Sequence, residues 1–194
     1  MNLADAENPT LNMKSSFLRL YSFIYFFFFK SKLKTDKRIF IFDIDNTIAD
    51  TWPSLSQKWT SEVSRTLALP VFESLQKELI LLQKDENNQV FFLTARSLKM
   101  YPHTIKWLKQ KKIDATYGNV FVVPDPKTKI CWLSKVCNMH SIVFIDDLSF
   151  HHETGVVKFY EKEINQLQNL HLQYIGYNEL IKIQQNKMSL YDII

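Results

Sequence analysis

Short apolar runs alternate with amphipathic stretches over most of this chain. Five runs have the length of buried strands, at residues 38–43, 89–93, 120–123, 141–145 and 170–175. Helical spacing is found between and after them, at residues 54–67, 71–84, 101–112, 126–136 and from 178 onward. Alternation of this kind is typical of parallel sheets whose strands are connected by helices. The sequence therefore predicts an α/β fold, a Rossmann-like doubly wound parallel sheet, over residues 35–194.

The length and the glycine content narrow the class of protein further. A chain of 194 residues is enough for one domain of this kind, but not for two of full size. It contains only three glycines, Gly118, Gly155 and Gly176. Phosphate loops of the Walker and dinucleotide-binding kinds need closely spaced glycines, so both are excluded.

The first 34 residues differ from the rest of the chain. Residues 1–14 are polar and are predicted to be disordered, and residues 15–34 are predicted to form a hydrophobic and basic helix. This helix contains the aromatic-rich segment Phe17–Phe29 between flanking lysines. As a helix, the thirteen residues of this aromatic-rich segment would span about 20 Å, less than the ~30 Å hydrocarbon core of a bilayer. We expect an anchor lying in the membrane interface; packing on the domain, or pairing with a second copy, is the alternative.

The charge distribution and the cysteines bear on partners and compartment. The net charge of +4 is carried by residues 1–38, and the remainder of the chain is balanced. A domain whose positive and negative charges cancel does not favour nucleic acid as a partner, although a local basic groove could still bind nucleic acid. Cys131 and Cys137 face different sides of a predicted helix and are not expected to pair. We therefore expect a cytoplasmic protein, with membrane association through the aromatic segment.

Polar residues follow the predicted strands at the points where they end. In doubly wound sheets the active site lies beyond the carboxyl ends of the strands, so these side chains should gather in one place. They are Asp43, Asp45 and Thr47 after the first strand, Thr94 and Arg96 after the second, Lys127 and Lys129 after the third, and Asp146 and Asp147 after the fourth. Acids, hydroxyls and cations around one crevice indicate a site for phosphate and magnesium.

These residues form a pattern that resembles the haloacid dehalogenase superfamily. Phe42-Asp-Ile-Asp-Asn-Thr47 matches its first motif, and Phe91-Phe-Leu-Thr94 matches its second. A lysine opening a helix and the pair Asp146–Asp147 match the third and fourth. The segment Lys127–Trp132 is similar to the third motif of the phosphatase domain of polynucleotide kinase-phosphatases. The four motifs occur in order from residue 39 to about residue 147.

The resemblance implies a magnesium-dependent phosphatase and a role for each matching residue. Asp43 would be the nucleophile that forms an aspartyl phosphate, and Asp45 would be the general acid and base. The metal would be bound by the Asp43 side chain, the Asp45 backbone carbonyl and a fourth-motif acid. Asp146 is preferred for that last position over Asp147. The residues expected to bind phosphate are Thr47, Thr94, Arg96 and Lys127, with Lys129 as the alternative lysine.

The substrate is not determined by the motifs. In the family that the motifs resemble, substrate choice depends on a cap, an inserted segment that covers the site. Only 46 residues separate Thr47 from Thr94, and most are needed for two helices, so the cap is absent or a single helix near residues 54–67. An open site suits bulky or macromolecular phosphate esters. The alternatives are a nucleotide or nucleic-acid-end phosphatase and a catalytically silent, membrane-tethered binding module.

Two positions depart from the family pattern. Asn46 stands where glycine is common, although asparagine tolerates the same turn. Leu148 and Ser149 stand where the polynucleotide phosphatases have an arginine, which argues against a nucleic-acid substrate. His151 and His152, just beyond, are expected to be exposed loop residues.

Overall fold

A computed structural model describes the backbone of residues 9–194 and the side chains of residues 21–152 and 154–194. Its centre is a five-stranded, fully parallel sheet with the strand order β3-β2-β1-β4-β7. The strands are β1 (Arg38–Phe42), β2 (Asn88–Thr94), β3 (Val120–Val122), β4 (Ile142–Ile145) and β7 (Gln173–Ile175). The predicted α/β class and all five predicted strands are confirmed.

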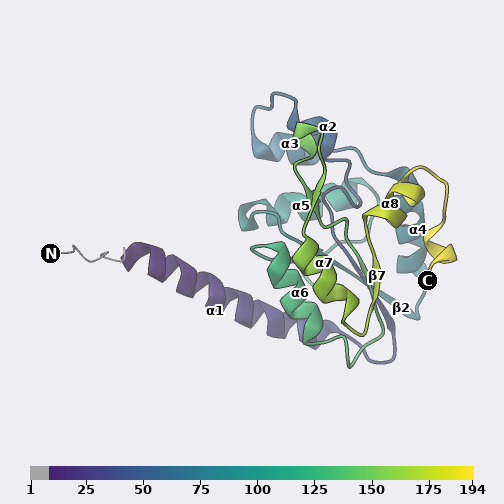
Figure 1. The fold of residues 1–194 in the computed structure, drawn as a ribbon, viewed down its shortest axis with the longest axis horizontal. Coiled ribbons are helices and arrows are strands. Elements are labelled where there is room, and N and C mark those ends of the chain that lie inside the picture. Colours follow the sequence, from purple (N-terminus) through teal and green to yellow (C-terminus); the bar gives the residue numbers. More distant parts are fainter. Residues whose placement is uncertain (1–8) are drawn as a thin grey trace.

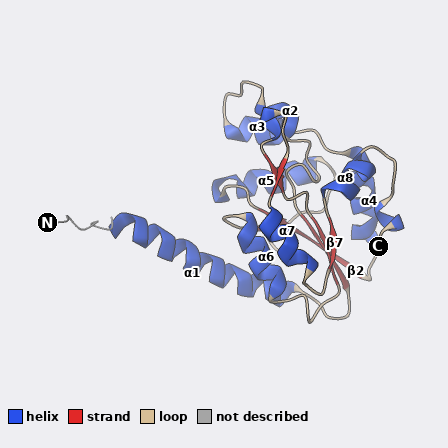
Figure 2. Ribbon diagram, in the orientation of Figure 1, coloured by secondary structure: helices blue, strands red, loops and turns tan. Residues whose placement is uncertain are grey.

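Helices cover both faces of the sheet, as Figures 1 and 2 show. One face packs against α4 (Glu73–Lys84), α5 (Tyr101–Gln110), α8 (Tyr177–Gln184) and the short η3 (Leu190–Asp192). The other face packs against α1 (Pro9–Lys32), α6 (Pro126–Ser134) and α7 (Glu161–Gln168). This three-layer arrangement is compatible with the predicted Rossmann-like fold.

The central strand β1 shows why these residues form a buried sheet. Ile39, Phe40, Ile41 and Phe42 are all fully buried. Because side chains alternate along a strand, Phe40 and Phe42 enter one core and Ile39 and Ile41 enter the other. A strand buried on both faces reads as a continuous apolar run, which is what made β1 recognisable in the sequence.

The region expected to form a single cap helix is divided in two. It contains α2 (Trp52–Leu55) and α3 (Glu62–Ala68), joined by a short connection. Ser61 starts α3 afresh, because its side chain accepts a hydrogen bond from the backbone N–H of Ser64 and the Ser64 side chain accepts one from the Ser61 N–H. Two short helices therefore take the place of the single helix expected near residues 54–67.

Small elements beyond β4 were not expected from the sequence. The antiparallel pair β5 (Ser149–Phe150) and β6 (Lys158–Phe159) lies near the short helix η2 (His152–Thr154). Earlier in the chain, the short helix η1 (Leu98–Met100) leads into α5 and was not expected either. Strands of two residues carry too little periodicity to be recognised in a sequence.

Helix α1 extends out from the body of the molecule (Figure 1). It runs from Pro9 to Lys32, so it includes residues 9–14, which had been expected to be disordered; residues 1–8 lie outside the described part. Its inner face packs on the domain, with Phe29 fully buried. Among the described residues, no helix has the length and apolar character needed to cross a bilayer.

Candidate active site

The residues expected to form the site meet at the carboxyl end of the sheet. β1 positions Asp43 and Asp45, β2 ends in Thr94, and β4 positions Asp146 and Asp147. Because β1 lies between β2 and β4, the three strand ends are neighbours. All five residues line one cavity of about 150 Å³.

Lys129 of α6 reaches the same cavity and joins two of the acids. Its Nζ lies 2.6 Å from Oδ1 of Asp43 and 2.7 Å from Oδ2 of Asp146. The residue is only 2% exposed. An ammonium group buried to this extent links the loop after β1 to the loop after β4.

The preference for Lys127 is corrected by this geometry. Lys127 is exposed in the first turn of α6, whose N-cap is Asp125. Two residues make about 200° of helical turn, so Lys127 and Lys129 lie on nearly opposite faces. Lys129 shares its face with the buried Leu133, one turn later. That spacing is the signal that could have identified Lys129 from the sequence.

Asp43, Asp146 and Asp147 form a group that could hold a metal ion. Their side chains are buried, and one carboxylate oxygen of each lies within 4.8 Å of the others. Burial raises the pKa of Asp43 to about 7, although Lys129 opposes this effect. Burial, followed by the charge of Asp146, raises the pKa of Asp147 well above its usual value. A single ammonium does not balance three carboxylates, so the donor set fits a hard divalent cation.

Asp45 has a different environment, and its carboxylate is not part of this group. Arg96 donates two hydrogen bonds to it, from Nε at 2.8 Å and from Nη2 at 2.7 Å. Burial alone would raise the pKa of Asp45, but the Arg96 guanidinium lowers it below the usual value. Arg96, expected to bind substrate phosphate, instead pairs with Asp45 in this structure.

The two threonines have different surroundings. Thr47 is fully buried, and its hydroxyl accepts a hydrogen bond from the Asp147 backbone N–H at 3.3 Å. It therefore joins the loops after β1 and β4 and does not line the cavity, contrary to its expected role in phosphate binding. Thr94 is 1% exposed and does line the cavity. Its hydroxyl has no hydrogen-bond partner among the described residues, so it is available to a ligand.

The loop after β1 adopts a tight turn that α8 supports. Asn46 has a φ of 58°, in the left-handed region that asparagine tolerates better than most residues. This agrees with the expectation that asparagine can replace glycine here. Gln184 of α8 donates from Nε2 to the carbonyl oxygens of Asn46, at 2.9 Å, and Thr47, at 3.3 Å. The C-terminal helix thus holds the turn that follows Asp43.

The loop after β4 carries a polar network that sequence reasoning missed. Ser149 donates a hydrogen bond to Asp147, and its hydroxyl lies 2.6 Å from Nε2 of His152. The His152 ring stacks on Trp52, with 3.7 Å between the ring centroids. The His152 side chain is only 3% exposed, so the expectation of an exposed loop histidine was wrong for this residue. Its only signal in the sequence was its position just after the fourth motif.

A larger cavity of about 530 Å³ adjoins the first, and both are lined by Asp45, Asn46 and Ala95. Arg65 of α3 lines this second cavity and is half-buried. It lies 3.4 Å from the hydroxyl of Ser54, and no carboxylate among the described side chains pairs with it. The cap residue Arg65 had not been singled out in the sequence.

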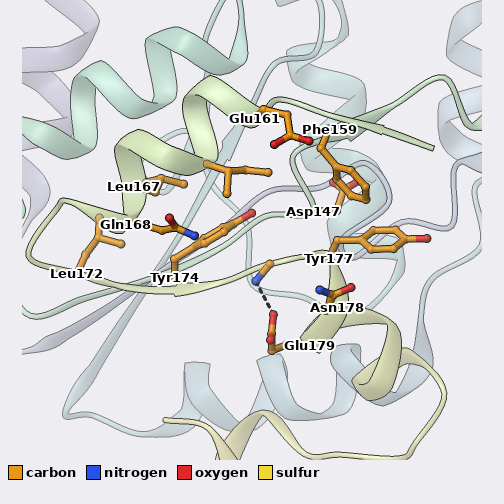
Figure 3. Close-up of a pocket in the computed structure, with 12 residues that line it drawn as sticks. Asp147, Phe159, Glu161, Leu167, Gln168, Leu172, Tyr174, Tyr177, Asn178 and Glu179 are labelled. Atoms are coloured by element: carbon orange, nitrogen blue, oxygen red, sulfur yellow. Dashed lines mark hydrogen bonds between the residues drawn. The ribbon is translucent and has the colours of Figure 1, made fainter.

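A third cavity lies on the far side of Asp147. Figure 3 shows its aromatic and acidic lining, which includes Phe159, Tyr174, Tyr177, Glu161 and Glu179, around a volume of about 630 Å³. Tyr174 donates a hydrogen bond to the carbonyl oxygen of Asp146 at 2.9 Å. The wall of this cavity therefore supports the loop that carries Asp146 and Asp147.

No protein-family model matches the chain, and no curated protein matches it.

Proposed function

We propose that this chain is a magnesium-dependent phosphomonoesterase of the haloacid dehalogenase type. The observation that carries the proposal is the buried group of Asp43, Asp146 and Asp147 around Lys129 at the carboxyl end of the sheet. The Thr94 hydroxyl, which has no partner among the described residues, lines the same cavity. Together they supply a nucleophile, a cation and a hydrogen-bond donor for a phosphoryl group.

Asp43 is the proposed nucleophile. One of its carboxylate oxygens forms a bond to phosphorus while the bond from phosphorus to the leaving oxygen breaks, which gives an aspartyl phosphate. Water then attacks phosphorus, the bond to Asp43 breaks, and inorganic phosphate leaves. Lys129 and Thr94 stabilise the charge on the phosphoryl oxygens in both steps.

Asp45 is the proposed proton carrier, on the side of the larger cavity. It would give a proton to the leaving oxygen and later take one from the attacking water. Its pairing with Arg96 favours the ionised form, so proton delivery requires that pair to open. A dianionic phosphate entering the cavity would compete with Asp45 for the Arg96 guanidinium, which also returns Arg96 to its expected role.

Magnesium would be held by Asp43, Asp146 and Asp147, together with the backbone carbonyl of Asp45. When bound, it would supply the positive charge that offsets repulsion between the Asp43 carboxylate and the phosphate oxygens. The balance of one lysine against three buried acids supports a divalent cation at this position.

The cavity of about 530 Å³ supports a bulky leaving group. It opens on the Asp45 side, where the leaving oxygen would be protonated, and its walls include the short helices α2 and α3 and the segment Phe150–His152. Arg65 would face an anionic group on the leaving part of the substrate. Nucleotides and nucleic-acid ends, whose further phosphates are such groups, form the alternative substrate class.

The proposal is tested by hydrolysis of an aryl phosphate by the full chain, with and without magnesium. We expect turnover that requires magnesium and falls by at least about 10³-fold in Asp43→Asn. Asp114→Asn makes the same change at an exposed aspartate that does not line the site cavity, and it serves as the matched control. Thermal unfolding with and without magnesium, on the same samples, reports metal binding independently of turnover.

Turnover that persists in Asp43→Asn would contradict the assigned nucleophile. A chain that neither hydrolyses phosphate esters nor gains thermal stability from magnesium would instead be the catalytically silent binding module. Magnesium binding without hydrolysis of the aryl ester would direct the search to nucleotides and phosphorylated ends.

A further inference from the structure

Helix α1 has apolar side chains on two faces, and the domain covers only one of them. On the inner face, the Phe29 ring lies 5.0 Å from that of Phe121 and 5.5 Å from that of Trp132. Tyr25 also donates a hydrogen bond to the carbonyl oxygen of Val120 at 3.3 Å. These contacts with β3 and α6 hold the C-terminal half of α1 against the sheet.

The outer face of α1, defined here as Phe23, Ile24, Phe27 and Phe28, lies open. These residues are 58%, 61%, 53% and 40% exposed, respectively. Their spacing places them on one continuous strip of the helix. Contiguous exposed aromatic residues of this size mark an interaction site far more often than single exposed apolar residues do.

Positive charge borders the outer face. At about 100° per residue, Lys30 and Lys32 fall on its two edges, and the ammonium of Lys32 lies 4.9 Å from the centroid of the Phe28 ring. Lys34 and Lys135 are exposed nearby, and Lys135 lies over the ring of Phe26. No acidic residue occurs between Glu7 and Asp36.

We propose that the outer face of α1 binds the surface of an anionic lipid bilayer. Phenylalanine rings enter the boundary between headgroups and acyl chains, while flanking lysines reach back to the lipid phosphates and carboxylates. Because the inner face is held by the domain, α1 lies along the bilayer with only its outer face in lipid. The body of the protein is thereby held against the membrane through a rigid helix. The proposal does not depend on the chemistry of the active site.

A second copy of the chain is a poorer occupant of this face. In a two-fold pair the same strip would meet itself, so lysines on its borders would face lysines. The face carries no carboxylate to compensate for that repulsion. An anionic bilayer satisfies the apolar strip and the lysines together.

The experiment is sedimentation of the full chain with lipid vesicles. Vesicles of phosphatidylcholine with roughly 30% phosphatidylserine are compared with phosphatidylcholine alone. We expect strong binding to the anionic vesicles, weakened by added salt, and weak binding to the neutral ones. Phe27→Ser should weaken binding about tenfold, because the ring no longer leaves water. Leu81→Ser is the matched control, since Leu81 is exposed to the same 53% on α4.

The variants change exposed side chains, so circular dichroism and thermal unfolding should match the unaltered chain. Equal loss of binding in Leu81→Ser and Phe27→Ser, or failure of the unaltered chain to bind anionic vesicles, would overturn the proposal. So would a dimer in lipid-free sedimentation equilibrium that Phe27→Ser dissociates, because the second copy would then be the occupant. Loss of binding in Lys30→Gln/Lys32→Gln on anionic vesicles, at unchanged fold, would support it.

Discussion

Two regions of the molecule have unusual burial: charged side chains are buried at the carboxyl end of the sheet, and aromatic side chains are exposed on the outer face of α1. At the sheet edge, Asp43, Lys129 and Asp146 are buried, although charged side chains favour water. On α1, Phe23 and Phe27 are more than half exposed, although aromatic side chains favour a core. Both arrangements cost free energy in the isolated chain. Each is therefore consistent with a proposed ligand, a cation and phosphate at the first and lipid at the second.

The largest expected effect tests whether the buried charges depend on each other. Lys129→Met leaves Asp43 and Asp146 without their counter-charge, so the free energy of unfolding should fall by about 3–5 kcal/mol without metal. Lys127→Met changes an exposed lysine on the same helix and should stay within about 0.5 kcal/mol of the unaltered chain. Urea unfolding measures both. Similar losses in the two variants would show that the lysines had been assigned wrongly.

Substitutions on the two faces of α1 should also differ strongly in their effect on the free energy of unfolding. Phe29→Ala opens a cavity between α1, β3 and α6, and the free energy of unfolding should fall by about 3–5 kcal/mol. Phe27→Ala, two residues earlier on the outer face, should change it by less than about 0.5 kcal/mol. Both are measured by urea unfolding without lipid. A large loss in Phe27→Ala would mean that the outer face is already covered in solution.

The pH dependence of stability gives a smaller and more specific test of the buried acids. The pKa of Asp43 is about 7 in the folded chain, compared with an ordinary value of 3.8. Between these values the folded state binds more protons than the unfolded state, so metal-free stability should fall as pH rises from about 4 to about 7. In Asp43→Asn this part of the slope should disappear, whereas Asp114→Asn should retain it. Urea unfolding across that pH range measures the slope, and an unchanged slope in Asp43→Asn would contradict the prediction.

The smallest expected effect concerns the larger cavity. Phosphoserine differs from phosphoethanolamine by one carboxylate, so the two substrates isolate the effect of a second anion. Arg65→Gln should lower kcat/KM for phosphoserine about tenfold, because a charge-assisted hydrogen bond is lost, and leave phosphoethanolamine unchanged. Lys58→Gln, which changes an exposed lysine in the connection between α2 and α3, is the control. Equal effects on the two substrates would remove Arg65 from leaving-group recognition.

The sheet and its acids could be predicted from the sequence because they depend on local pattern. Apolar runs such as residues 38–42 are stable only where helices cover both faces of the sheet. The polar residues that follow them must then lie together at the carboxyl end of the sheet. The positions of Asp43, Asp146 and Thr94 in the cavity follow from this alone. The presence of a helix before residue 35 was likewise indicated by its composition.

The remaining details depend on tertiary packing. Which lysine enters the site depends on how α6 is rotated against the sheet, so local motif similarity pointed to Lys127 although Lys129 is the buried one. The pairing of Arg96 with Asp45 joins residues 51 positions apart and leaves no local trace. The Ser149–His152 contact joins β5 and η2, which are too short to show hydrophobic spacing or capping signals.

The hydrogen bonds from Gln184 to the Asn46 and Thr47 carbonyls have a consequence for how the protein is made. The turn that follows Asp43 is translated early, but the side chain that holds it belongs to a helix translated more than a hundred residues later. Domains are synthesised at about 5–20 residues per second, so a nascent chain spends several seconds with β1 complete and its turn unsupported. The turn beside the candidate site is therefore supported only after α8 has left the ribosome and docked.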